Sequence, residues 1–215
     1  GFGNVGWGVV KKTAELGGKV VAIAGPDGYI YDPDGAVTDE KINYLLEMRA
    51  SGRDKVQDYA DKFGCEFHAG EKPWGLGADK VDIMMPCATQ NDVNMDSAKK
   101  IAASGIKYYI EVANMPTTND ALEFLKEQKH MVIAPSKAVN ACGVAVSALE
   151  MAQNAERLYW TAEEVDAKMH QIMANIYHSS VAAAERYGLG YDLVAGANIV
   201  GFQRVADAMT AQGIF

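Results

Sequence analysis

Cysteine, positive charge and long apolar runs are all scarce in this sequence. Its 215 residues include three cysteines, and 20 Lys and Arg stand against 28 Asp and Glu, a net charge of -8. Widely spaced cysteines with no CxxC pair exclude a disulfide scaffold and a zinc knuckle. The shortage of Lys and Arg disfavours binding to a phosphate backbone, so no nucleic-acid partner is expected. Since no apolar run approaches the ~18 residues that span a bilayer, no membrane insertion is expected either.

Signatures of catalysis are also scarce. The four histidines have no metal-ligand spacing, so no metal site is expected, and neither GxSxG nor a P-loop motif occurs. Cys87 follows a predicted strand, but it has no basic neighbour that would favour its thiolate. The residues therefore predict binding of a ligand more clearly than its chemical conversion.

The overall composition is that of an ordinary globular chain, with 49% hydrophobic and 22% charged residues. This length suits one large domain, or one domain with an appended piece. The sequence opens on Gly1-Phe2-Gly3 with no charged region leading into an apolar segment, so no signal peptide is expected. Together with the unpaired cysteines, this predicts a reducing, cytoplasmic location.

The opening residues Gly1 to Gly6 fit the pattern GxGxxG, a turn that cradles phosphate where a strand leads into a helix. A helix up to Leu16 and a strand over 19–24 follow, as that context requires. Asp27 comes 21 positions after Gly6, near the ~20-residue offset at which a carboxylate reaches a ribose hydroxyl. The alternative is a nucleotide-free turn in which Asp27 forms an Asx turn with Gly28.

Strands and helices alternate along the next part of the chain. Residues 29–37 are expected to be a loop, followed by helices over 38–50, 53–63, 95–103 and 119–128 and strands over 66–69, 81–85, 107–112 and 131–134. This alternation predicts an α/β fold, a Rossmann-like, doubly wound and mainly parallel sheet. After Cys142 only helical patterns occur, to about 158, over 163–187 and over 198–212.

Two regions are therefore predicted: a dinucleotide-binding domain over 1–150 and a helical tail over 151–215 that packs on it. No strand precedes Gly1 in the sequence, so the sheet is expected to lack its first strand. Such a sheet has unpaired backbone groups and an unfilled slot in its core.

Polar residues follow several of the predicted strands, at the edge where ligands bind in such sheets. Thr89, Asn114 and Asn140 are neutral hydrogen-bonding side chains in these positions. They suit the hydroxyls and the amide of a nicotinamide riboside. The alternative is that they cap loops and turns.

Six separated motifs together resemble the coenzyme domain of hexameric bacterial glutamate dehydrogenases, within the Glu/Leu/Phe/Val dehydrogenase superfamily. In order they are residues 1–6, 25–29, 86–91, 111–118, 134–140 and 150–154. The resemblance implies reversible oxidative deamination of L-glutamate to 2-oxoglutarate and ammonia, with hydride transfer between the substrate Cα and a nicotinamide cofactor. It also implies a homohexamer of full-length chains. The family's catalytic lysine and aspartate belong to an amino-terminal domain that is not in this sequence, so no catalytic residue and no activity are expected of the chain alone.

The resemblance also assigns binding residues by motif. Those expected around the pyrophosphate are Gly1, Gly3, Asn4, Val5 and Gly6, and those expected at the nicotinamide and its ribose are Ala88, Thr89, Gln90, Asn114 and Asn140. Val144 and Ser147 are expected to contact the glutamate side chain. For Ser147 the alternative is a bond back to its own helix backbone.

NAD is expected as the cofactor in preference to NADP. Asp27 places a carboxylate where NADP carries a phosphate, and Phe2 with Pro26 offers an apolar adenine pocket. Arg49, Arg53 and Lys55 could still approach such a phosphate. Two alternatives remain: a leucine, valine or phenylalanine dehydrogenase of the same superfamily, and a non-catalytic nucleotide-binding module.

Overall fold

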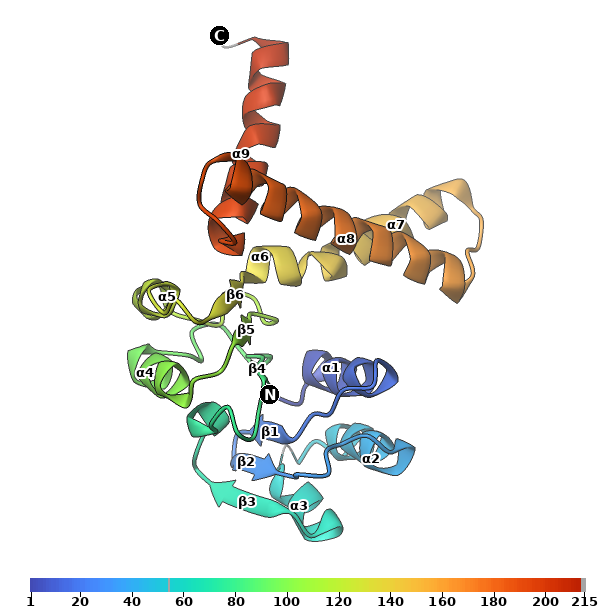
Figure 1. The fold of residues 1–215 in the computed structure, drawn as a ribbon. Coiled ribbons are helices and arrows are strands. Elements are labelled where there is room, and N and C mark those ends of the chain that lie inside the picture. Colours follow the sequence, from blue (N-terminus) through green and yellow to red (C-terminus); the bar gives the residue numbers. More distant parts are fainter. Residues whose placement is uncertain (54, 214–215) are drawn as a thin grey trace.

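Two three-stranded sheets and the helices around them form the body of the molecule (Figure 1). The structure is a computed structural model that describes residues 1–53 and 55–213. The body contains, in chain order, α1 (Asn4–Glu15), β1 (Ala22–Gly25), β2 (Gly28–Tyr31), α2 (Asp39–Ala50), α3 (Gln57–Phe63), β3 (Glu66–Ala69), a 3-10 turn (Pro73–Gly75), β4 (Ile83–Met84), α4 (Met95–Ser104), β5 (Tyr108–Ile110), α5 (Asn119–Lys126) and β6 (Val132–Ala134).

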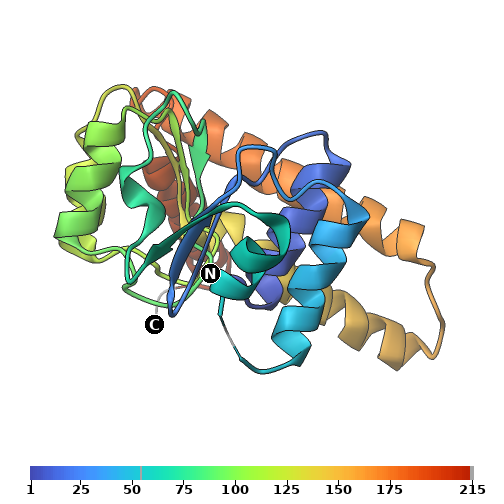
Figure 2. The same ribbon diagram turned by 90° about the horizontal axis from the view of Figure 1, so that it is seen from below.

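The two sheets differ in direction. Strands β4, β5 and β6 are parallel and lie in that order, with Tyr109 opposite Ile133. Strands β1, β2 and β3 are antiparallel neighbours, with Ile23 opposite Ile30. Helices α1 and α2 lie on one side of the strands, and α4 and α5 lie on the other side, as the two views show (Figures 1 and 2). The predicted α/β class with a parallel sheet and a helical tail is confirmed.

The expected loop over 29–37 is wrong at its start, because Gly28–Tyr31 forms β2. Pro26 and Asp27 make a two-residue hairpin connection from β1, and Tyr29 and Ile30 are buried between neighbouring strands. Gly28 has φ 149°, and a Cβ there would lie 2.2 Å from the His68 carbonyl oxygen. Only glycine fits this turn, and it allows the close pairing with β3.

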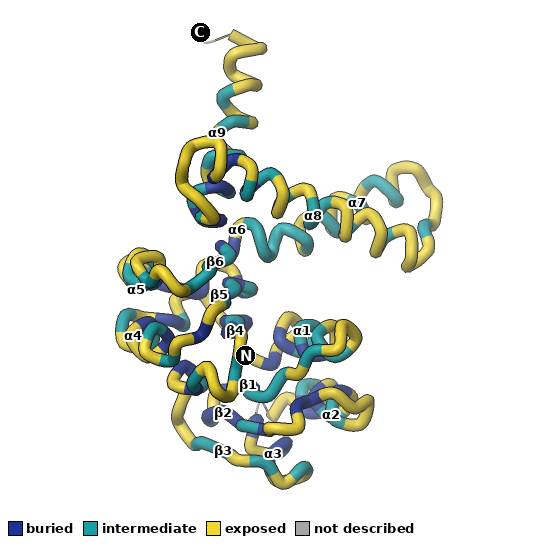
Figure 3. The backbone as a smooth tube through the Cα atoms, in the orientation of Figure 1, coloured by how far each residue is buried: buried dark blue, intermediate teal, exposed yellow. Residues whose placement is uncertain are grey.

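Buried residues form two apolar clusters, and Ala24 of β1 and Tyr29 of β2 belong to the same cluster as the parallel sheet (Figure 3). Ile30, Leu45 and Tyr59 lie in the cluster between the antiparallel sheet and its helices. Tyr109 and Leu125 lie in the cluster between the parallel sheet, α4 and α5.

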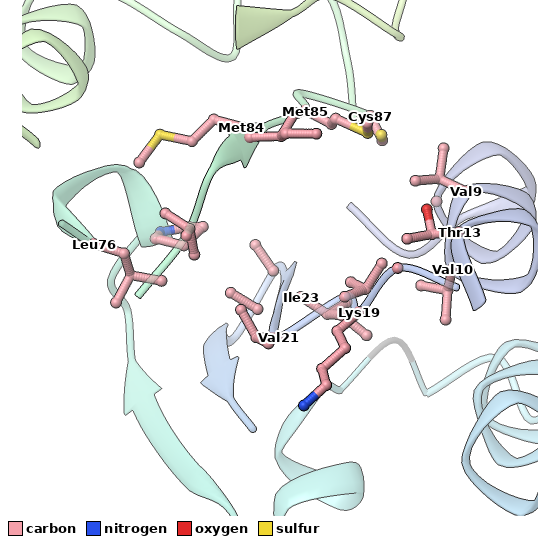
Figure 4. Close-up of a pocket in the computed structure, with 18 of the residues that line it drawn as sticks. Val9, Val10, Thr13, Lys19, Val21, Ile23, Leu76, Met84, Met85 and Cys87 are labelled. Carbon is pink, nitrogen blue, oxygen red and sulfur yellow. The ribbon is translucent and has the colours of Figure 1, made fainter. Parts of the chain in front are cut away.

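A cavity of about 520 Å³ separates the two sheets between β1 and β4. Val21 and Ile23 lie on one side of it, and Met84 and Met85 lie on the other (Figure 4). β1 and β4 are both edge strands, so each has one side without a strand partner among the described residues. That a strand ahead of Gly1 belongs in this cavity stays a prediction.

The chain after β6 is helical, as predicted, in α6 (Ser136–Val139), α7 (Ala141–Glu156), α8 (Ala162–Arg186) and α9 (Leu193–Gln212). The end of α9 projects from the body (Figure 1). The boundary at 150 falls inside α7 and stays a prediction, and residues 214 and 215 of the expected tail lie outside the described part. Among the described helices, none is both long and apolar enough to cross a membrane.

Candidate functional site

The opening turn leads directly into α1, whose first turn faces solvent. Gly3 is the residue before the helix and makes no side-chain cap, and Asn4 and Val5 are exposed. The first N–H groups of a helix have no partner within the helix, and the helix dipole adds partial positive charge there. No acidic side chain occupies this turn. The N-terminus of α1 is therefore suited to bind an anion such as a phosphate.

The glycines of this turn have different roles. A Cβ on Gly6 would lie 2.1 Å from the Gly1 carbonyl oxygen, and one on Gly1 would lie 2.8 Å from the Cα of Ala88. A Cβ on Gly3 would meet no atom within 4 Å. Gly1 and Gly6 are thus required for chain packing, whereas Gly3 leaves open space beside the free N–H groups.

Asp27 lies near this turn, but its carboxylate already has partners. Its Oδ1 accepts from the Val56 N–H and its Oδ2 from the Gln57 N–H, both at 3.0 Å. It therefore binds the start of α3 rather than forming the Asx turn with Gly28. Nothing local in the sequence signals this contact, because the partners are about 30 positions away.

Phe2 and Pro26 do not form an open pocket together. Phe2 is only 5% exposed and packs in the core, with its Cε1 3.1 Å from where a Gly25 Cβ would lie. Pro26 is exposed. Of the two residues expected at the adenine, only Pro26 is therefore exposed to solvent.

Backbone hydrogen bonds join the loops that follow β4 and β5. Ala113 donates to the Pro86 carbonyl at 2.9 Å, and Asn91 donates to the Met115 carbonyl at 3.0 Å. Asn91 and Met115 have φ of 57° and 47°, a left-handed conformation that is uncommon outside glycine and concentrated at functional sites. No sequence pattern indicates this pair.

The side chains predicted for the nicotinamide end lie on these joined loops. Ala88, Thr89, Gln90 and Asn114 are exposed. Asn140 is half-buried after α6, and its Nδ2 donates to the Ala113 carbonyl at 3.5 Å. The structure thus brings the ends of β4, β5 and β6 into one polar surface.

Val144 and Ser147 are exposed on α7, the helix that follows Asn140. The Ser147 hydroxyl donates to the Gly143 carbonyl at 3.3 Å, which is the backbone bond named above as its alternative. Their contact with a substrate stays a prediction.

Groups suited to chemistry are few. Burial raises the pKa of the Cys87 thiol, which disfavours the reactive thiolate. Among residues 1–53 and 55–213, no three His, Cys, Asp or Glu side chains come together as a metal site would require.

The fold and the turn define a class: a Rossmann-like α/β domain with an open helix N-terminus at the carboxyl edge of its strands. The family model described as Glutamate/Leucine/Phenylalanine/Valine dehydrogenase matches residues 1–213. The chain belongs to this family.

Individual relatives are similar over the whole chain. It is 72% identical over 214 residues to the NAD-specific glutamate dehydrogenase of Clostridium symbiosum, covering 100% of the chain and 47% of that protein. It is 47% identical over 216 residues to the NADP-specific glutamate dehydrogenase of Escherichia coli, covering 100% of the chain and 46% of that protein. A solved glutamate dehydrogenase structure superposes with a TM-score of 0.95 at 72% identity, covering 100% of the chain and 47% of the solved one. The chain thus spans about half the length of these relatives.

Proposed function

We propose that the chain is the coenzyme-binding part of an NAD-dependent glutamate dehydrogenase. The reaction is the reversible oxidative deamination of L-glutamate to 2-oxoglutarate and ammonia. The observation that carries the proposal is the open first turn of α1 beside Gly3, where free N–H groups face space that no side chain of the described residues fills.

This observation also indicates where each part of the cofactor binds. The pyrophosphate binds at the residues from Gly1 to Gly6, where N–H groups and the helix dipole stabilise its negative charge. The adenosine ribose lies towards Asp27, and the nicotinamide riboside lies along the joined loops that carry Thr89, Gln90, Asn114 and Asn140. Neutral hydrogen-bonding side chains suit ribose hydroxyls and a carboxamide.

A charge argument favours NAD over NADP. Both carboxylate oxygens of Asp27 are held by α3, so its negative charge is fixed in position. A 2'-phosphate of about -2 charge beside it would be repelled. The 72% identity to a relative named NAD-specific, against 47% to one named NADP-specific, supports the same choice.

Catalysis requires more than these residues. The chain provides the surface that holds the nicotinamide, and Val144 and Ser147 on α7 would reach the side chain of the substrate. The catalytic groups, and the closure that excludes water, are supplied by the part of the full-length protein that this chain does not span. Full-length chains assemble as a homohexamer in the same proposal.

A binding experiment with a matched pair of variants tests the proposal. Titration calorimetry should show clear binding of NADH and weaker binding of NADPH. Gly3→Ala should weaken NADH about tenfold or more, because its methyl group occupies the space the pyrophosphate needs, while the free energy of unfolding changes by less than about 1 kcal/mol.

Gly8→Ala is the control for that variant. Gly8 lies in α1, and a Cβ there also meets no atom within 4 Å. It should leave NADH affinity unchanged and stabilise the helix by up to about 1 kcal/mol. Equal NADH binding by Gly3→Ala and Gly8→Ala would refute the site, preference for NADPH would refute the cofactor choice, and turnover of glutamate by the chain alone would refute the division of roles.

A further inference from the structure

Glu111 is a buried carboxylate that the proposed cofactor contacts do not use. It directly follows β5 at the carboxyl edge of the parallel sheet and is only 3% exposed. Its Oε2 accepts from the backbone N–H of Ser136 at 3.0 Å. In the described part of the chain, no Lys or Arg forms an ion pair with it. A charge buried this deeply with one N–H partner is costly, so a structural link alone is a weak reason for it.

The hydrogen bond to Ser136 places Glu111 in a closed ring of contacts. Ser136 is the first residue of α6, and its carbonyl accepts from the Asn140 N–H at 2.9 Å. The Asn140 side chain donates in turn to the Ala113 carbonyl, and Ala113 follows Glu111 by two residues. The ring therefore joins the loop after β5 to the segment after β6.

This ring of contacts fixes the positions of two residues assigned to the nicotinamide end. Asn114 is next to Ala113, and Asn140 is itself a member of the ring. If Glu111 releases Ser136, α6 can shift and the separation between the two asparagines is no longer fixed. Hydrogen bonds to a ligand are lost when their donors move by about 1 Å.

We propose that Glu111 is a positioning residue for the nicotinamide end of the cofactor, and that its charge favours the oxidised ring over the reduced one. The inference rests on the proposed function. The oxidised nicotinamide is a cation and the reduced ring is neutral. In the proposed placement the ring lies along the loop that follows Glu111, so the carboxylate stabilises only the oxidised form, and burial strengthens that attraction.

Two substitutions distinguish the effect of the hydrogen bond to Ser136 from the effect of the Glu111 charge. Glu111→Gln keeps an oxygen that can accept from Ser136 and removes the charge, whereas Glu111→Ala removes both. Glu123→Gln is the matched control, because Glu123 is an exposed carboxylate on α5 paired with Lys126. Each variant of the 215-residue chain is titrated with NAD⁺, NADH and ADP-ribose, which has the adenosine and pyrophosphate but no nicotinamide.

The expected pattern differs for each variant. Glu111→Gln weakens NAD⁺ about fivefold and leaves NADH within about twofold of the unmodified chain. Glu111→Ala weakens both about tenfold, because Asn140 is no longer held. Neither substitution changes ADP-ribose affinity by more than about twofold, and Glu123→Gln changes nothing.

Several results would overturn the inference. One is an equal loss of NAD⁺ and NADH affinity, or no loss of either, in Glu111→Gln. Another is a parallel loss of ADP-ribose affinity, which would mean general structural damage. If Glu111→Ala does not fold by circular dichroism, Glu111→Gln alone decides. Failure of the unmodified chain to bind ADP-ribose or NADH refutes the proposed function itself, and the two failures are thereby distinguished.

Discussion

At the scale of single residues, Asp32 joins the loop after β2 to two helices. It is 4% exposed and accepts hydrogen bonds from Lys41 of α2 at 2.6 Å and from the Tyr59 hydroxyl of α3 at 2.9 Å. Burial opposes its charge, but the bonds from Lys41 and Tyr59 hold the pKa of the Asp32 carboxyl below its usual range. Burial and the neighbouring Asp32 raise the pKa of Tyr59, so its hydroxyl stays a donor.

This cluster predicts a dependence of stability on pH. Because the pKa of Asp32 is lower in the folded chain than in the unfolded one, its contribution is complete above the unfolded value of about 3.9. The contribution is lost as pH falls through the lower folded pKa. Asp32→Asn should cost about 2 kcal/mol at pH 7, because Lys41 is left partly buried without its counterion. Urea unfolding at pH 7 and pH 3 measures both effects.

The control for Asp32→Asn is Glu40→Gln, an exposed carboxylate on α2. It should change the free energy of unfolding by less than about 0.5 kcal/mol. The variant Asp32→Asn should also lose less stability than the unmodified chain between pH 7 and pH 3. If both proteins lose the same amount, Asp32 is not the source of the acid sensitivity.

At the scale of elements, α8 and α9 cross at a point where only glycine fits. A Cβ on Gly196 of α9 would lie 2.0 Å from the Ser180 carbonyl oxygen of α8. Gly196→Ala should therefore force the helices apart and cost about 2–3 kcal/mol in urea unfolding. Gly201→Ala, in the same helix with no atom within 4 Å, should stabilise by about 0.5–1 kcal/mol. Similar values for the two variants would show that the crossing adjusts freely.

Helices were predictable from sequence more accurately than strand pairing was. The expected helix over 38–50 is α2, because Thr38 accepts a hydrogen bond from Lys41 as a local N-cap. The strand at Gly28–Tyr31 was missed because the surrounding Gly, Asp and Pro residues indicate turns, and because one of its two partner strands, β3, lies nearly 40 residues away. Local signals fix caps and turns, whereas long-range pairing fixes short strands.

The features of the candidate site also divide into those that local sequence predicts and those that it does not. The glycine pattern was readable because its spacing is local and fits the turn that the structure shows. The partners of Asp27, the burial of Phe2 and the left-handed Asn91 were not, since each depends on contacts between distant segments. A single sequence without long-range contacts carries no signal for them.

At the scale of the whole molecule, the cavity of about 520 Å³ lies between two edge strands, β1 and β4. Gly25, at the end of β1, lies against Phe2, and Ala88, just after β4, lies against Gly1. Both strands therefore end beside the first two residues, so a strand leading into Gly1 would run parallel to both. The buried indole N–H of Trp74, which lines the cavity, has no acceptor among the described residues. A backbone carbonyl in the slot could accept from it.

Filling this slot should stabilise the molecule. An extension of five Val and Ile residues ahead of Gly1 should raise the melting temperature by several degrees, because a strand buried on both faces is continuously apolar. An extension of five Gly and Ser residues is the control and should not. Equal melting temperatures for the two extended chains would mean that the cavity does not accept a strand.

The separation of the two sheets also affects the cooperativity of unfolding. β1–β3 and β4–β6 share no ladder of hydrogen bonds within the described chain, so either sheet can open while the other keeps its bonds. Amide hydrogen exchange should then reveal two units rather than one, with Ile30 of β2 and Tyr109 of β5 most protected in their own sheets, because each central strand is paired on both sides. An inserted strand would merge them into a single unfolding transition.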